Sequence, residues 1–207
     1  MDRPEQKIDT CSGIILCGGK SSRMEYENKC LLRVRGRTFI EIIKERMESF
    51  FAEVLLVTKE PHLYELSSCK IVEDIFPSFS SLTGIHAGLV NSSSFFNLVV
   101  GCDTPLIRGE VISLLLSQIS PEVDVVIPKI RGFYEPLCAI YSKRCIPVIE
   151  RLLQEKRFAI REVFKYVSLK EISEEEVAIS DPSLVSFFNI NTPEDYKRLL
   201  EIYLYLF

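Results

Sequence analysis

The sequence predicts an α/β fold built around a mostly parallel, doubly wound sheet. Its apolar runs are short, and each has the length of a buried strand: 14–17, 53–58, 70–73, 95–101 and 124–128. Stretches with helical spacing of apolar residues separate most of these runs, which is the pattern of parallel βαβ crossovers. The length of 207 residues fits one domain. We therefore expect a Rossmann-like three-layer sandwich in which residues 1–207 form a single domain.

Composition narrows the class of protein. With 47% hydrophobic and 26% charged residues, the chain has the make-up of a globular protein. The formal charge is −4 and no block of Lys or Arg stands out, so we expect neither nucleic acid nor an anionic membrane as a partner. No apolar run approaches the roughly 18 to 20 residues of a membrane span. Residues 1–10 are too polar for a secretory signal, and a cytoplasmic location is expected.

The cysteines and histidines predict no metal or disulfide scaffold. The seven cysteines are scattered without a C-x-x-C pair, whereas a zinc site or a disulfide framework would show closer pairing. Reduced thiols are therefore expected. The chain has only two histidines, His62 and His86, which are too few for a His-rich metal site. The sequence also lacks a nucleophile elbow, so a Ser-His-Asp hydrolase is not expected.

A glycine-containing loop follows the first apolar run. Gly18 and Gly19 let the backbone turn sharply and come close to a ligand, because neither residue has a Cβ. Lys20, Arg23 and Lys29 follow, so backbone N–H groups and cations together form a cradle for a polyphosphate. The alternative is an ordinary glycine turn with basic residues on the surface.

Two familiar phosphate loops do not fit this stretch. A Walker A loop has four residues between its first glycine and Gly-Lys-Ser/Thr, whereas five separate Gly13 from Gly19. The dinucleotide pattern G-x-G-x-x-G is also absent, since the two glycines are adjacent and no third follows in register.

Several later elements can be predicted from local signals. Thr38 and Glu41 form a capping box that begins a helix. Segments 143–155 and 159–167 are predicted to be helical, and the acidic segment 171–179 to be a solvated loop or an edge. Residues 187–191 are predicted to be a final strand or loop, followed by a helix that begins at Thr192-Pro193.

Two aspartates follow apolar runs in the way the glycine loop does. Ligands of doubly wound sheets bind beyond the carboxyl ends of the strands, so we expect the loop and Asp103 in one site. Asp103 either caps the next helix or binds Mg²⁺ together with nucleotide phosphates; its place opposite the loop favours Mg²⁺. Asp74 follows residues 70–73 and has the same two readings, a turn or cap against a functional role.

The loop LCGGKSSRM with Lys29 resembles the signature loop of nucleotidyltransferases. The further segments VED (ending at Asp74), SLTGIHAGL (81–89), GCDTP (101–105), EPLCAIY (135–141) and FFNINTPED (187–195) resemble, in order and interval, those of molybdenum cofactor guanylyltransferases. That resemblance implies a nucleotidyltransferase domain that transfers GMP from GTP to the terminal phosphate of molybdopterin and releases pyrophosphate. It also implies Mg²⁺ as cofactor and, as protein partners, molybdoenzymes or other proteins of cofactor biosynthesis.

The resemblance also implies roles for individual residues. Arg23, Lys29 and Asp103 would serve catalysis, with Lys29 on the triphosphate and Asp103 as the Mg²⁺ ligand. Residues expected against the guanine nucleotide are Leu16, Cys17, Gly18, Gly19 and Asp74. Asn189 and Asn191 would face the pterin, although both also suit a simple turn before a helix.

This sequence departs from the family pattern at several positions. Cys17 stands where alanine is usual, Glu25 replaces a common glycine, and Asn28 replaces an acid. These changes leave the reaction type alone but bear on the choice of nucleotide. One rival function is a cytidylyltransferase of the same fold, whose loop more often reads LAAG. The other is a catalytically silent nucleotide-binding subunit, which would have no need of Arg23, Lys29 and Asp103 together.

Overall fold

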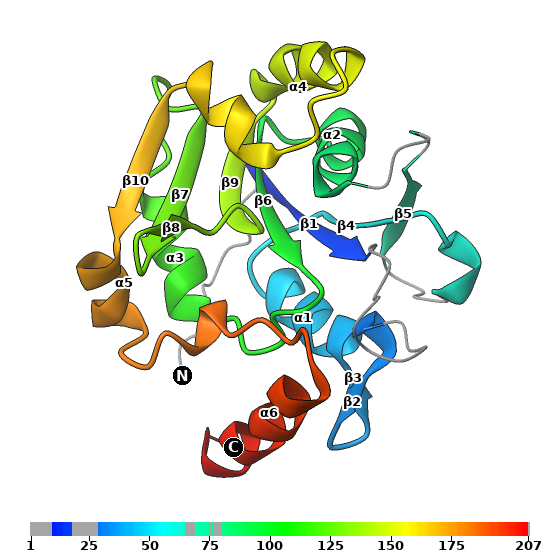
Figure 1. Ribbon diagram of the computed structural model, residues 1–207, viewed down its shortest axis with the longest axis vertical. Coiled ribbons are helices and arrows are strands. Elements are labelled where there is room, and N and C mark those ends of the chain that lie inside the picture. Colours follow the sequence, from blue (N-terminus) through cyan, green and yellow to red (C-terminus); the bar gives the residue numbers. More distant parts are fainter. Residues whose placement is uncertain (1–9, 18–28, 65–68, 75, 77–79, 207) are drawn as a thin grey trace.

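The computed structural model describes residues 10–17, 29–64, 69–74, 76 and 80–206 (Figure 1). Most strands belong to one eight-stranded sheet of order β10-β7-β9-β6-β1-β4-β5, with β8 paired to β7. Their bounds are Cys11–Cys17 (β1), Val54–Thr58 (β4), Lys70–Glu73 (β5), Phe96–Gly101 (β6), Val125–Ile130 (β7), Phe133–Tyr134 (β8), Cys138–Ser142 (β9) and Leu169–Ser173 (β10).

The sheet is mixed but mostly parallel. β1 pairs in parallel with β4 and β6, β4 with β5, and β7 with β10. β9 is inserted between β6 and β7 and runs antiparallel to both. The predicted α/β class with a mostly parallel sheet is confirmed.

Helices cover both faces of the sheet, which makes three layers (Figure 1). Alternation along β1 assigns its side chains to the two faces, as the two-residue period of a strand requires. Ile14 and Leu16 pack with α2 (Ser81–Asn91) and α4 (Cys145–Gln154). Ile15 and Cys17 pack with α1 (Phe39–Glu48), α3 (Gly109–Ser117) and α5 (Glu174–Ser180). A core therefore lies on each side of the sheet.

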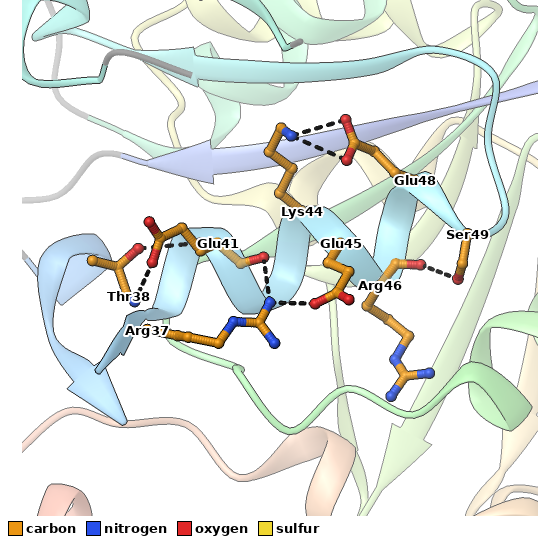
Figure 2. Close-up of polar contacts among 8 residues, drawn as sticks. All are labelled: Arg37, Thr38, Glu41, Lys44, Glu45, Arg46, Glu48 and Ser49. Atoms are coloured by element: carbon orange, nitrogen blue, oxygen red, sulfur yellow. Dashed lines mark hydrogen bonds and ion pairs between the residues drawn. The ribbon is translucent and has the colours of Figure 1, made fainter. Parts of the chain in front are cut away.

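Helix α1 shows how local signals set an element (Figure 2). Glu41 N–H donates to the Thr38 hydroxyl at 3.3 Å, and Thr38 N–H donates to the Glu41 carboxylate at 2.7 Å, so the predicted capping box is confirmed. On its polar side the half-buried Lys44 and Glu48 pair at 3.0 Å, one turn apart. Such pairs add only a few tenths of a kcal/mol, about 0.3–0.5, so the buried face of α1 supplies most of its stability.

A third apolar cluster joins residues 32–39 to the C-terminal segment of the chain. The closing helix α6 (Pro193–Leu206) packs there against the small hairpin of β2 (Arg33–Val34) and β3 (Arg37–Thr38). The buried members of the cluster are Leu32, Val34, Phe39, Leu106, Val185, Ile190 and Leu199. The short 3₁₀ turns of this structure are η1 (Lys29–Leu31), η2 (Pro61–Leu63), η3 (Ile160–Lys165) and η4 (Val185–Phe187).

For two segments the sequence left two alternatives, and the structure decides between them. Residues 171–179 are no loop: they contribute to the edge strand β10 and to helix α5, where Ser173 and Glu176 form a second capping box. The expectation of an edge was correct for β10. Glu174, Glu175 and Glu176 lie in the first turn of α5, where their negative charge interacts favourably with the positive end of the helix dipole. Phe187 ends η4, and residues 188–191 form no strand, so the loop alternative is the correct one for this segment. Among the described residues, no helix is long and apolar enough to cross a membrane.

Candidate functional site

The carboxyl ends of four parallel strands meet at one edge of the sheet. Cys17 is in register with Thr58, and Thr58 with Glu73. On the other side of β1, Leu16 is in register with Gly101. The residues that follow these strands, Asp74 and Asp103 among them, therefore share the edge where ligands of such sheets bind.

Asp103 lies two residues after the end of β6, and a hydrogen bond to its backbone carbonyl fixes its position. Its carbonyl accepts a hydrogen bond of 2.9 Å from the Ile190 N–H, which ties it to the segment before α6. A Cβ on Gly101 would lie 2.6 Å from Asp103 Oδ1, so glycine leaves the room that the carboxylate occupies. Burial raises the pKa of Asp103, and the positive charge of Lys29 opposes part of that rise.

Lys29 lies at this same edge, within electrostatic reach of Asp103. Its ammonium donates a 2.7 Å hydrogen bond to Asn191 Oδ1. Asn191 is itself fixed, because its N–H and that of Thr192 donate to the Asp195 carboxylate at 3.0 and 2.9 Å. The structure thus brings three of the predicted site residues together from distant parts of the chain: Lys29, Asp103 and Asn191. Asn189 is half-buried in the same segment, two residues earlier.

Glu135 is a functional candidate that sequence reasoning did not assign. It precedes the antiparallel strand β9, and Gly101 N–H donates to the Leu137 carbonyl at 3.0 Å. The start of β9 therefore lies beside the end of β6. Burial raises the pKa of Glu135 to about 7, and the negative charge of Asp103 adds to the rise. The segment 135–141 was singled out by resemblance, but only the direction of β9 brings its glutamate to this edge.

Asp74 is buried and fully engaged within the protein. Thr83 donates its hydroxyl to one carboxylate oxygen at 2.6 Å, and the Phe76 N–H donates to the other at 3.1 Å. Lys59 lies 3.6 Å away, and its ammonium also reaches the Phe76 carbonyl. Asp74 thus joins the end of β5 to the first turn of α2, which is the turn-forming role. Its contact with a nucleotide stays a prediction.

The remaining predicted residues divide into two groups. Leu16 and Cys17 are 7% and 1% exposed, with side chains in the two cores, so any contact with a nucleotide falls to their backbone. Gly18, Gly19 and Arg23 lie outside the described residues, and their roles stay predictions.

The chemistry of the site fits a divalent cation. Asp103 and Glu135 are two carboxylates that burial has partly removed from water, and the negative charge of Asp103 further raises the pKa of Glu135. Carboxylate oxygens combined with phosphate oxygens and water form the environment that Mg²⁺ prefers. A shared cation would favour the ionised form of both groups.

Comparisons with known proteins identify the family of the chain. The model of the MobA-like NTP transferase domain matches residues 13–172. The molybdenum cofactor guanylyltransferase of Desulfosudis oleivorans is 37% identical over 191 residues, which cover 92% of this chain and 95% of that protein.

Solved structures share the fold. Molybdopterin-guanine dinucleotide biosynthesis protein A from Archaeoglobus fulgidus superposes with a TM-score of 0.83 at 28% identity, covering 94% of this chain and 100% of the other. Rv0371c from Mycobacterium tuberculosis, crystallised as a complex with manganese, has a TM-score of 0.65 at 15% identity, over 93% and 98% of the two chains. This last likeness concerns the fold alone. By sequence and by fold, the chain belongs to the MobA-like NTP transferase family, among the relatives of the molybdenum cofactor guanylyltransferases.

Proposed function

We propose that the protein transfers GMP from GTP to the terminal phosphate of molybdopterin, releasing pyrophosphate and forming the guanine dinucleotide cofactor. The observation that carries this proposal is the meeting of Lys29, Asp103 and Asn191 at the carboxyl ends of the strands. The identity of 37% to a molybdenum cofactor guanylyltransferase, over almost the whole of both chains, supports the same reaction. We also propose that residues 1–207 act as one nucleotidyltransferase domain.

The proposed reaction requires that the two substrates be positioned for attack and that the negative charge of the phosphates be neutralised. The acceptor phosphate is already ionised, so in-line attack on the α-phosphate of GTP needs no general base. Mg²⁺, held by Asp103 with Glu135 nearby, would supply charge neutralisation for the leaving pyrophosphate.

Side chains and backbone groups of the protein would bind the triphosphate and the acceptor. Lys29 would leave Asn191 for the triphosphate, because a phosphate oxygen carries more negative charge than an amide oxygen. Asn191 and Asn189 would then be available to the acceptor side of the pocket. Arg23 and the glycine pair would complete the phosphate cradle.

The direct test is transfer by the purified protein. Incubation with GTP, Mg²⁺ and molybdopterin should yield the guanine dinucleotide, detected by mass spectrometry, together with pyrophosphate. A parallel reaction with CTP tests the base. Product from CTP but not from GTP would establish the cytidylyl alternative. Tight binding of nucleotides without product from either would point to the silent subunit and contradict the proposal.

A further inference from the structure

Three cysteines meet beside the candidate site. Cys17 ends β1, Cys30 lies in η1, and Cys102 follows β6. Their Sγ atoms all lie within 4.8 Å of one another. Cys17 and Cys30 are each 1% exposed, and the Cys102 N–H donates to the Leu16 carbonyl at 3.1 Å. All seven cysteines of the chain are reduced, so these three thiols are not consumed by a disulfide.

The environment of these sulfurs differs from that of cysteines packed as small apolar residues. Their sulfurs hydrogen bond to one another, and the buried Tyr64 also hydrogen bonds to the Cys30 sulfur. Burial disfavours a thiolate, but these hydrogen bonds outweigh it at Cys30 and lower the pKa of that thiol, whereas the pKa values of Cys17 and Cys102 are raised well above their ordinary value. Because the thiolate is the form of cysteine that binds metal ions, a cluster with one stabilised thiolate favours the binding of a cation.

We propose that Cys17, Cys30 and Cys102 form a thiolate site for a thiophilic divalent cation, with Zn²⁺ as the ion that fits best. A Zn–S bond measures about 2.3 Å, so tetrahedral sulfurs stand about 3.8 Å apart. The observed separations of at most 4.8 Å then require a contraction of about 1 Å or less. A water or other oxygen ligand completes the fourth position.

Charge and ligand type keep this site distinct from the Mg²⁺ site next to it. Thiolates select Zn²⁺ and similar soft ions, whereas Mg²⁺ takes oxygen ligands. Each thiol loses its proton when it binds, so three thiolates and one Zn²⁺ leave a net charge of −1. Lys29, the neighbour of Cys30 in the sequence, supplies a compensating positive charge.

The site has a structural consequence. Cys17 and Cys30 stand on either side of residues 18–29 in the sequence, the stretch that includes Lys20, Arg23 and Lys29. Cys102 adjoins Asp103. A metal bound to all three thiolates ties both ends of that stretch to the tip of β6. Ordinary spacing rules missed the site because its ligands come from three separate segments, with no C-x-x-C pair.

The test is zinc binding by the full chain, reduced with a phosphine and freed of metal. Zn²⁺ is titrated in competition with a chromophoric chelator, with excess Mg²⁺ present to occupy oxygen ligands. Wild type should bind one Zn²⁺ per chain. Cys30→Ser should bind it at least about tenfold more weakly, since changes even outside the direct ligands cost that much. Cys69→Ser is the matched control, because Cys69 lies elsewhere, with its thiol 3.2 Å from the Val54 carbonyl.

A second variant and a second readout keep the test decisive. Cys17→Ala removes another ligand, and alanine is usual at this position in the loop that the sequence resembles, so this variant should fold even if Cys30→Ser does not. With Co²⁺ in place of Zn²⁺, the thiolate-to-metal charge-transfer absorption should be strong in wild type and in Cys69→Ser and reduced in both cluster variants. Absence of zinc binding in wild type, or unchanged affinity in both cluster variants, would overturn the proposal.

Discussion

The ammonium of Lys29 lies 2.7 Å from the amide oxygen of Asn191, across 162 positions of sequence. Asn191 is fixed by Asp195 at the start of α6, so this contact connects the turn after the glycine loop to the end of the chain. In the proposed reaction Lys29 exchanges this amide for the triphosphate. The pair would then hold the two segments together before GTP binds, and Lys29 would contact the triphosphate afterwards.

Replacing Lys29 by alanine should weaken GTP binding and slow transfer. The lost charge faces phosphates, so we expect kcat/KM to fall roughly 100-fold, while thermal stability stays nearly unchanged because the side chain is partly exposed. Lys70→Ala is the control: Lys70 begins β5, at the opposite edge of the sheet, and its ammonium bonds the Asn91 carbonyl. Equal kinetics for the two variants would show that Lys29 is an ordinary surface cation.

Replacing Gly101 by alanine should raise the Mg²⁺ concentration that the reaction requires. An added Cβ would fall 2.6 Å from Asp103 Oδ1, so the carboxylate must move. Overpacking of this kind costs about 1–3 kcal/mol. We expect transfer by the variant to need more Mg²⁺ for half-maximal rate. Gly84→Ala provides the comparison, since its added Cβ meets Leu16 at an ordinary 3.4 Å. An unchanged Mg²⁺ dependence in Gly101→Ala would contradict the placement of Asp103 as the ligand.

The raised pKa of Glu135 predicts that the free energy of unfolding depends on pH. Its pKa in the folded protein is about 7, whereas an unfolded glutamate titrates near about 4.3. Between these values the folded state holds a proton that the unfolded state has lost. The free energy of unfolding should therefore be highest, as far as this group is concerned, below about pH 4.3 and should fall as pH rises toward 7.

Urea unfolding of the metal-free protein across that pH range measures this slope. Glu135→Gln cannot titrate and should flatten the profile, whereas Glu201→Gln, an exposed glutamate of α6, should leave it as in wild type. Added Mg²⁺ should reduce the fall in wild type, because a cation favours the ionised carboxylate. An identical slope in Glu135→Gln and wild type would rule out Glu135 as the cause.

Local signals allowed part of this structure to be predicted from sequence. The capping box of Thr38 and Glu41 involves residues three apart, and apolar runs located the strands to within a few residues. The parallel pairing of β1 with β6 followed from their separation by helices, so the common edge of Cys17 and Asp103 could be expected.

Contacts that depend on strand direction and distant pairing were missed. Residues 138–142 do not by themselves show the direction of β9. The signal lay in residues 131–137, which separate it from β7 and are too few for the crossover of a dozen or more residues that a parallel strand needs. Glu135 therefore received no role until the direction of β9 placed it near Asp103. The cysteine cluster was missed for a related reason: Cys102 stands 72 residues after Cys30 (102 − 30), and only folding brings their thiols together.

Asp103→Asn is the sharpest test of the proposed mechanism. The substitution keeps the shape of the side chain and the backbone carbonyl that accepts from Ile190, but it removes the charge. If Asp103 only caps or turns the chain, asparagine should serve as well, because asparagine and aspartate cap helices about equally. If it holds Mg²⁺ against the triphosphate, the charge that builds on the leaving pyrophosphate loses its stabilisation. Losing one such electrostatic contact costs on the order of 100- to 1000-fold in rate. Since burial raises the pKa of Asp103, removing its charge should also leave the folded protein at least as stable as wild type. The informative measurement is the transfer rate in limiting Mg²⁺ beside the unfolding midpoint of the same sample. Near wild-type transfer in that variant would leave Asp103 with a structural role alone.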